Sequence, residues 1–183
     1  MATRTRPVRL ACALVGIVAV AAGCFPMAPT TPNAESSKPP IVSLPDEASM
    51  QQVIDPAKEF VILNQLQDVT GGFGWVACGG QNEALYYGEA QVMFKLPEGV
   101  DEDRYLKQIV KMMVSHGWMD GPAQGDRSFG TLLHTNEVRA AITGSDSYYQ
   151  GLGKVLLSGE CRNTNDHRDD SAGIDITAQL TQR

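Results

Sequence analysis

Residues 86–118 read YYGEAQVMFKLPEGVDEDRYLKQIVKMMVSHGW and contain the two patterns that decide the fold. From Tyr86 to Leu96, apolar and polar residues alternate, as in an antiparallel strand with one solvated face. After Asp101, apolar residues recur at helical spacing: Leu106, Ile109, Val110 and Met113. The stretch therefore predicts a half-buried strand followed by an amphipathic helix.

The predicted helix has start and stop signals of its own. Asp101 is the expected N-cap, and the acidic Glu102 and Asp103 favour the positive end of the helix dipole. Gly117 is expected to end the helix, and Trp118 to fold back as the apolar contact after the cap.

A second helix and a strand are expected upstream. Asp55 as N-cap and Pro56 at the first helical position predict the helix start, in preference to a short helix opening at Asp46. Gly71-Gly72 is the expected stop, and Phe73–Cys78 the strand. The helical spacing is carried by Phe60, Leu63, Leu66 and Val69.

The remaining pattern is that of strands. Phe129–His134 and Val138–Thr143 predict a hairpin, Lys154–Arg162 a further strand and Ile174–Leu180 a final strand. The order predicts an α+β fold, a two-layer sandwich of a mainly antiparallel sheet of five or six strands with two helices on one face. Duplication of an α-β-β unit would fit this order, but no residue-level repeat supports it strongly.

The N-terminus carries an export signal. Arg4, Arg6 and Arg9 precede an apolar run, and Ala21-Ala22-Gly23-Cys24 ends the run as a lipobox. The run from Leu10 to Ala22 spans roughly 20 Å as a helix, less than the roughly 30 Å hydrocarbon core of a bilayer. We predict a lipoprotein signal peptide at 1–23 and acylation of Cys24. An ordinary secretory signal is the alternative, because Ala21 stands where lipoboxes more often carry Leu.

Residues 24–45 follow as the acylated cysteine and a proline-rich tether. Six of the ten prolines lie here, among Ala, Thr and Ser, a composition that favours a semi-extended chain. Residues 46–183 are then a single α+β envelope domain. The expected location is the cell membrane, lipid-anchored on the extracytoplasmic side.

Removal of the signal peptide changes the charge. It takes away three arginines and no acidic residue, and so lowers the formal net charge from −6 to −9. This acidity argues against nucleic acid as a partner and against attraction to an anionic membrane surface. Contact with the membrane is therefore expected through the lipid anchor.

Two cysteines remain for the domain. Cys12 leaves with the signal peptide and Cys24 is acylated, so Cys78 and Cys161 are the pair left in an oxidising compartment. We predict a disulfide between them, joining neighbouring strands. A redox pair or a metal site is the weaker interpretation, because neither cysteine lies in a C-x-x-C motif.

No catalytic residue, metal site or cofactor is predicted. His116 stands at a helix end, where it favours the dipole, and His134 at a hairpin end. His167 lies in the polar stretch 163–170, expected to be a solvated loop; acidic residues beside the histidine could bind a cation, but their spacing matches neither an EF-hand loop nor a zinc motif. No nucleophile elbow or phosphate loop is present. Tyr148 and Tyr149 are candidate recognition residues beside a loop.

Several motifs also carry a family resemblance. They are Gly71-Gly72-Phe73-Gly74 with Cys78-Gly79, the runs Leu96–Asp101 and His116–Pro122, and Gly159–Asn163. With the lipobox, they resemble the LppA-like lipoproteins of mycobacteria over residues 46–183. The resemblance implies a cell-envelope lipoprotein with a compact α/β domain, supports Cys24 as the acylation site and Cys78 with Cys161 as a pair, and transfers no active site.

Three functional hypotheses follow. The first is a non-catalytic envelope lipoprotein that binds a partner protein or envelope component through the open sheet face or its loops. The second is a carrier of an apolar small molecule or lipid in a helix–sheet cavity, lined by Met112, Met113 and Met119. The third and least favoured is an enzyme that uses His134 or His167.

Overall fold

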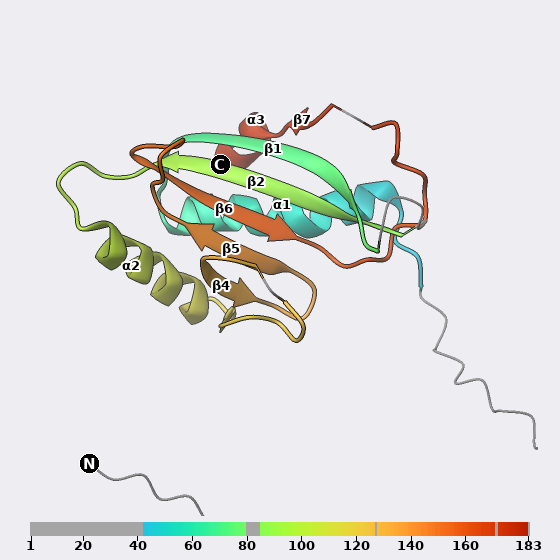
Figure 1. Ribbon diagram of the computed structural model, residues 1–183, viewed down its shortest axis with the longest axis horizontal. Helices are drawn as coiled ribbons and strands as arrows, with labels where there is room; N and C mark the ends of the chain where they lie inside the picture. The colour runs from blue at the N-terminus through green and yellow to red at the C-terminus, as the bar shows by residue number, and fades with distance from the viewer. Residues whose placement is uncertain (1–41, 80–84, 127, 171, 183) are drawn as a thin grey trace, which may run out of the picture. The chain divides into compact units, whose positions relative to one another are not determined.

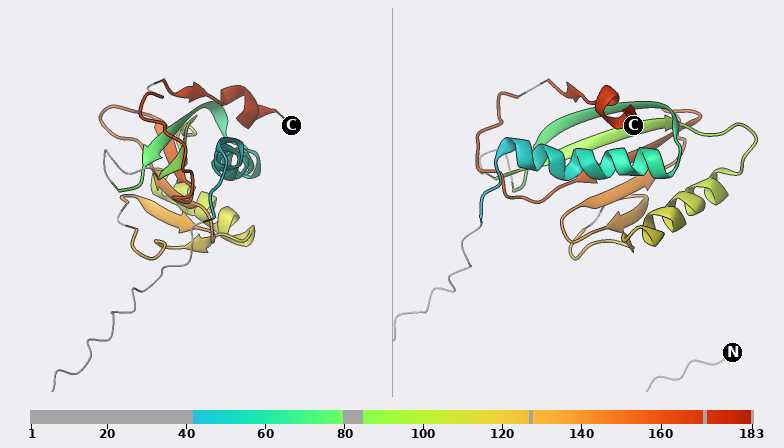
Figure 2. Two further views of the ribbon diagram at one scale, coloured as in Figure 1. Left: turned by 90° about the vertical axis from the view of Figure 1, so that its right-hand side faces the viewer. Right: turned by 180° about the vertical axis from the view of Figure 1, so that it is seen from behind.

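Among the residues that this computed structural model describes, three helices cover one face of a seven-stranded sheet (Figures 1 and 2). The structure describes residues 42–79, 85–126, 128–170 and 172–182, so the predicted signal peptide and Cys24 lie outside the described residues. The elements in chain order are α1 (Asp46–Leu63), β1 (Gln67–Ala77), β2 (Tyr86–Lys95), α2 (Glu102–Ser115), β3 (Met119–Asp120), β4 (Thr131–His134), β5 (Arg139–Thr143), β6 (Leu152–Ser158), β7 (Ile174–Asp175) and α3 (Thr177–Thr181).

The strands form one antiparallel sheet in the order β3-β4-β5-β6-β2-β1-β7. Alternate residues of β2 are buried beneath the helices, including Ala90, Val92 and Phe94, and the residues between them lie on the open face. The predicted α+β class and layered architecture are confirmed. The sheet has seven strands instead of the predicted five or six, because the two-residue edge strand β3 was not predicted. The two-residue β7 is the start of the predicted final strand.

The start of α1 differs from the prediction. The helix begins at Asp46, so Pro56 lies inside it instead of at its first position. Its buried residues follow a single helical stripe that runs through the proline: Val53, Ile54, Ala57, Phe60 and Val61. Burial of this stripe offsets the backbone hydrogen bond that an internal proline removes.

The end of α1 also differs. Leu66 and Val69 were predicted in the helix, yet the helix ends at Leu63 and β1 begins at Gln67. Gln65, between the two elements, and Asp68, the second residue of β1, take positive φ angles of 50° and 49° and turn the chain from the helix into the strand. Leu66 and Val69 are nevertheless part of the hydrophobic core, so both positions are apolar, and their spacing suggested that the helix continued.

The α2 prediction is confirmed at both ends. The Asp101 carboxylate accepts a hydrogen bond from the backbone N–H of Arg104 at 2.8 Å, and the helix ends at Ser115. The N–H of Trp118 donates to the carbonyl of Met113 at 3.2 Å, and the Trp118 side chain is buried. None of the described helices is long and apolar enough to cross a bilayer.

The predicted final strand is wrong beyond Asp175. The chain turns into α3, where the Asp175 carboxylate accepts from the N–H of Thr177 at 2.8 Å. Ile176 and Leu180 are both fully buried. Their four-residue spacing satisfies a helix as well as an alternating strand, so the sequence pattern could not separate the two.

Two glycines let helices approach the sheet. A Cβ on Gly88 would lie 2.8 Å from both the Phe73 ring and the backbone oxygen of Ser49 in α1. A Cβ on Gly71 would overlap the side chain of Leu180 in α3. Both positions therefore need glycine for close packing.

Candidate binding site

The loop after β6 folds back over the helix-bearing face of the sheet at one end of β1. His167 lies in this loop with its side chain 5% exposed, and its ring stacks on that of Trp75 with centroids 3.8 Å apart. The ring of Tyr86 lies nearly perpendicular to the His167 ring, with centroids 5.3 Å apart. The loop was predicted to be solvated, and for His167 and the fully buried Asn163 that prediction is wrong. The stacking on Trp75 explains the difference, because it removes the imidazole from water.

Hydrogen bonds complete the burial of His167. Its Nδ1 lies 2.6 Å from Oδ2 of Asp170, and its Nε2 lies 3.1 Å from Oδ1 of Asn163 and 3.3 Å from Oδ1 of Asp46. Both ring nitrogens therefore already face oxygen partners. This arrangement gives His167 a structural role, since a general base needs a nitrogen open to its substrate.

Asn163 is the centre of this network. Its side-chain NH₂ donates to Asp46 at 2.7 Å, and its Oδ1 also accepts from the N–H of Asn165 at 2.8 Å. The hydrogen bond from Asn163 is the main cause that lowers the pKa of Asp46 below its ordinary value. The network thus fastens the loop to the start of α1.

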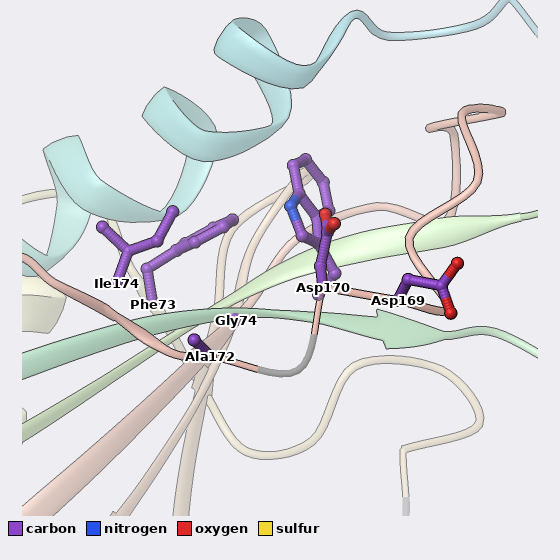
Figure 3. Close-up of a pocket in the computed structure, with 7 residues that line it drawn as sticks. Phe73, Gly74, Asp169, Asp170, Ala172 and Ile174 are labelled. Atoms are coloured by element: carbon purple, nitrogen blue, oxygen red, sulfur yellow. The ribbon is translucent and has the colours of Figure 1, made fainter.

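A pocket of about 400 Å³ opens beside this network, along the outer edge of β1 (Figure 3). We call it the edge slot. It is lined by Phe73, Gly74, Trp75, Asp169, Asp170, Ala172 and Ile174. Its volume falls within the roughly 300–1,000 Å³ of known ligand pockets. Phe73, Trp75 and Ile174 supply apolar surface, whereas Asp169 and Asp170 make the loop side acidic.

The open sheet face holds a smaller recess of about 90 Å³. Glu89 lies in it, 3.3 Å from the hydroxyl of Ser158, and burial raises the pKa of the Glu89 carboxyl. The Arg139 guanidinium lies 5.7 Å from the centre of the Tyr87 ring. The recess is large enough for a few water molecules but small for a ligand.

The predicted recognition residues lie elsewhere. Tyr148 is 89% exposed in the loop between β5 and β6, where the Asp146 carboxylate accepts from the N–H groups of both Tyr148 and Tyr149. Lys154 lies over the Tyr149 ring at 5.6 Å. Neither tyrosine lines the edge slot, and their role in recognition stays a prediction.

The other two histidines make local contacts. Nδ1 of His116 lies 2.8 Å from the carbonyl of Met112 at the end of α2, and Nδ1 of His134 lies 3.0 Å from that of Gly121. Neither lines the edge slot. Within the described ranges, no three His, Cys, Asp or Glu side chains are grouped to hold a metal ion.

The helix–sheet interface is filled with side chains. Phe60, Phe94 and Met113 are buried to at least 98% between the layers. Met112 and Met119, the other two methionines proposed for a carrier cavity, are 40% and 42% exposed. These positions weaken the carrier hypothesis.

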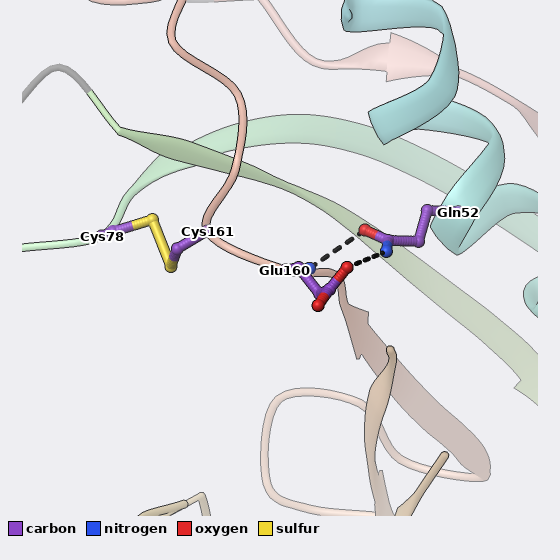
Figure 4. Close-up of a disulfide and its surroundings, with 4 residues drawn as sticks. All are labelled: Gln52, Cys78, Glu160 and Cys161. Carbon is purple, nitrogen blue, oxygen red and sulfur yellow. Dashed lines mark hydrogen bonds between the residues drawn. A yellow bond between two sulfur atoms is a disulfide. The ribbon is translucent and has the colours of Figure 1, made fainter. Parts of the chain in front are cut away.

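Cys78 and Cys161 form a disulfide in the structure (Figure 4). Their strands are not neighbours as predicted, because β2 lies between β1 and β6. The bridge joins chain segments just past the ends of β1 and β6, where Tyr86 pairs with Asn163. Next to it, Gln52 of α1 and Glu160 exchange two hydrogen bonds of 3.0 Å.

The residues that precede α1 are bound next to the disulfide. The backbone N–H of Leu44 donates to the carbonyl of Arg162 at 2.8 Å, and Nε of Arg162 donates to the carbonyl of Val42 at 2.8 Å. The hydroxyls of Ser43 and Thr164 lie 2.9 Å apart. Residues 42–44 are therefore tied to the chain directly after Cys161.

Sequence reasoning missed the network and the edge slot. Asn163 and His167 belong to a polar stretch, and nothing in their spacing shows that Trp75 and Asp46 will cover them. The closest signal is Trp75 itself, a large aromatic at the end of a strand.

Comparisons with known proteins agree on one family. The family described as "Putative lipoprotein LppJ" matches residues 45–179. The chain is 38% identical over 182 residues to proteins of that name from Mycobacterium tuberculosis (strain H37Rv) and Mycobacterium bovis, covering 98% of this chain and 95% of each relative. No solved structure matches the chain. The matches support the predicted class, a lipoprotein family known from mycobacteria, under the name LppJ instead of LppA. The chain belongs to the LppJ family of lipoproteins.

Proposed function

We propose that this protein is a lipid-anchored envelope protein that binds a partner protein and catalyses no reaction. The anchor is the acylated Cys24, and the domain lies on the extracytoplasmic side of the cell membrane. Membership in a lipoprotein family supports the anchor, and the lipobox supplies its position.

The edge slot is the observation that carries the binding proposal. It joins apolar surface, acidic side chains and the outer edge of a strand in one pocket. Its wall is held by the His167 network, so the site is formed before any partner arrives. A preformed site loses less conformational entropy on binding. The engagement of both His167 nitrogens supports binding over catalysis.

Anchoring is tested by replacing Cys24 with serine, which removes the thiol that accepts the diacylglyceryl group. We expect Cys24→Ser to abolish incorporation of an alkyne-labelled fatty acid during growth of a mycobacterial host. Cys12→Ser is the matched control, since Cys12 lies within the signal peptide, and it should keep the label. Equal labelling of wild type and Cys24→Ser would exclude this anchor.

Binding is tested by a photo-crosslinking amino acid at Ala172, an exposed residue that lines the edge slot. We expect irradiation of intact cells to give a discrete protein adduct from this position. The same amino acid at Glu59, exposed on the outer side of α1, should give none. A third position, Tyr148, tests the loop between β5 and β6: an adduct from Tyr148 alone would place the binding site in that loop. Partner binding would be refuted if none of the three positions gave an adduct.

A further inference from the structure

The backbone of β1 indicates how the edge slot is used, an inference that rests on the proposed function. We propose that an extended, basic segment of an envelope protein adds to β1 as a strand, in line with β7. Such strand addition takes affinity from main-chain hydrogen bonds and specificity from alternate side chains.

The first step is the direction of the backbone groups in β1. The N–H of Cys78 donates to the carbonyl of Leu85 at 2.9 Å, so even-numbered residues bond toward β2. Gly71 bonds the other way: its carbonyl accepts from the N–H of Ile176 at 3.0 Å and its N–H donates to the Thr177 hydroxyl at 2.9 Å. The register with β2 is regular from Thr70 to Ala77. By this alternation, Trp75 and Ala77 direct their N–H and C=O groups to the outer edge.

The second step is the short reach of β7. It pairs only with Gly72 and Phe73, so Gly74–Ala77 have no strand partner on that edge among the described residues. A continued β7 would place Ala172 opposite Trp75. Instead the edge slot opens between the strand and the loop that carries Ala172 (Figure 3).

The third step is that the edge residues of β1 themselves carry none of the usual protecting features. Natural sheets shield exposed edges with charged residues, proline or bulges. Residues 74–77 are Gly, Trp, Val and Ala, and the β1 irregularity lies at the opposite end, between Gln67 and Thr70. A Cβ on Gly72 or Gly74 would meet no atom within 4 Å, so own-chain packing does not require glycine there. The missing side chain at Gly74 leaves room for those of an added strand.

Charge identifies the occupant. Asp169 and Asp170 line the slot, and cleavage of the signal peptide leaves the chain with a formal charge of −9. Lysine or arginine in the added strand would meet these carboxylates, whereas an acidic strand would be repelled. The partner segment is therefore an extended stretch that alternates basic with apolar residues.

The test uses the full-length acylated protein in detergent micelles and a fluorescent peptide, KVTVKVTVK. Anisotropy measures its affinity, and amide hydrogen exchange locates it. We expect binding to slow exchange of the Trp75 and Ala77 amides roughly tenfold or more. An EVTVEVTVE peptide, and a KVTVKVTVK peptide methylated at alternate backbone nitrogens, should each bind at least about tenfold more weakly.

Paired glycine variants give the matched control. Gly74 lines the slot, so Gly74→Val places a branched side chain beside the path of the added strand and should weaken peptide binding roughly tenfold. Gly72→Val, on the same strand and face but not in the slot lining, should change the affinity less than about twofold. Asp169→Asn should also weaken binding. Equal binding of the methylated peptide, or binding that leaves the Trp75 and Ala77 amides unprotected, would overturn strand addition. If either of these results is found but adducts still form at Ala172, partner binding at the edge slot stands and only strand addition to β1 is refuted.

Discussion

Replacing both Cys78 and Cys161 with alanine is expected to lower the free energy of unfolding by roughly 4 kcal/mol. The two cysteines stand 83 positions apart, so the disulfide removes much conformational entropy from the unfolded chain. For a domain of this size, we expect the melting temperature to fall by roughly 10–20 °C.

Thermal and urea unfolding of the purified variant measure this loss. Wild-type protein treated with dithiothreitol is the matched comparison, because it breaks the same bond without a substitution. Reduction should destabilise wild type by a similar amount and leave the double variant unchanged. If oxidised wild type and the double variant unfold at the same temperature, the bridge contributes nothing to stability.

Asn163→Ala is expected to cost roughly 3 kcal/mol, the largest loss we predict for a single polar side chain outside the disulfide. Asn163 is fully buried and contacts Asp46, the N–H of Asn165 and His167. Its removal leaves the buried His167 ring without one of its partners. Asn165→Ala is the matched control: Asn165 is exposed, its side chain donates to Asp46 at 2.8 Å, and the expected loss is below about 1 kcal/mol.

The same variant has a predicted pH signature. The folded state lowers the pKa of Asp46, chiefly through the bond from Asn163. That stabilisation is present above the ordinary pKa of an aspartate and is lost as the pH falls below it. The difference in unfolding free energy between wild type and Asn163→Ala should therefore shrink between neutral pH and about pH 3. A difference that stays constant over this range would contradict the role given to the Asp46–Asn163 bond.

Elements with local signals could be predicted from the sequence. The α2 helix carries its own cap at Asp101 and its own stop after Ser115, so its bounds depend on residues within a few positions. The alternation along β2 likewise shows which residues face the helices. Both predictions were confirmed because no distant contact competes with them.

Other elements depend on contacts that the sequence does not display. Pro56 is a local start signal, but the apolar stripe of α1 continues on both sides of it, and packing against β2 overrides the signal. Ile176 and Leu180 fit a strand and a helix equally well, and the close approach of α3 to Gly71 decides for the helix.

The candidate site was the least predictable part. Its network joins Asp46, Trp75 and His167, which come from the start of α1, the end of β1 and the loop after β6. The edge slot in turn exists because β7 stops after two residues. Each residue had an ordinary interpretation alone, as a helix start, a strand aromatic or a loop histidine.

The attachment of residues 42–44 to Arg162 has a mechanical consequence. Tension on the N-terminal end of the described chain acts first on the Leu44–Arg162 and Val42–Arg162 hydrogen bonds. Arg162 follows Cys161 directly, and the disulfide passes the load to Cys78 at the end of β1. Force therefore reaches β6 directly and β1 through the disulfide before it can peel α1 away.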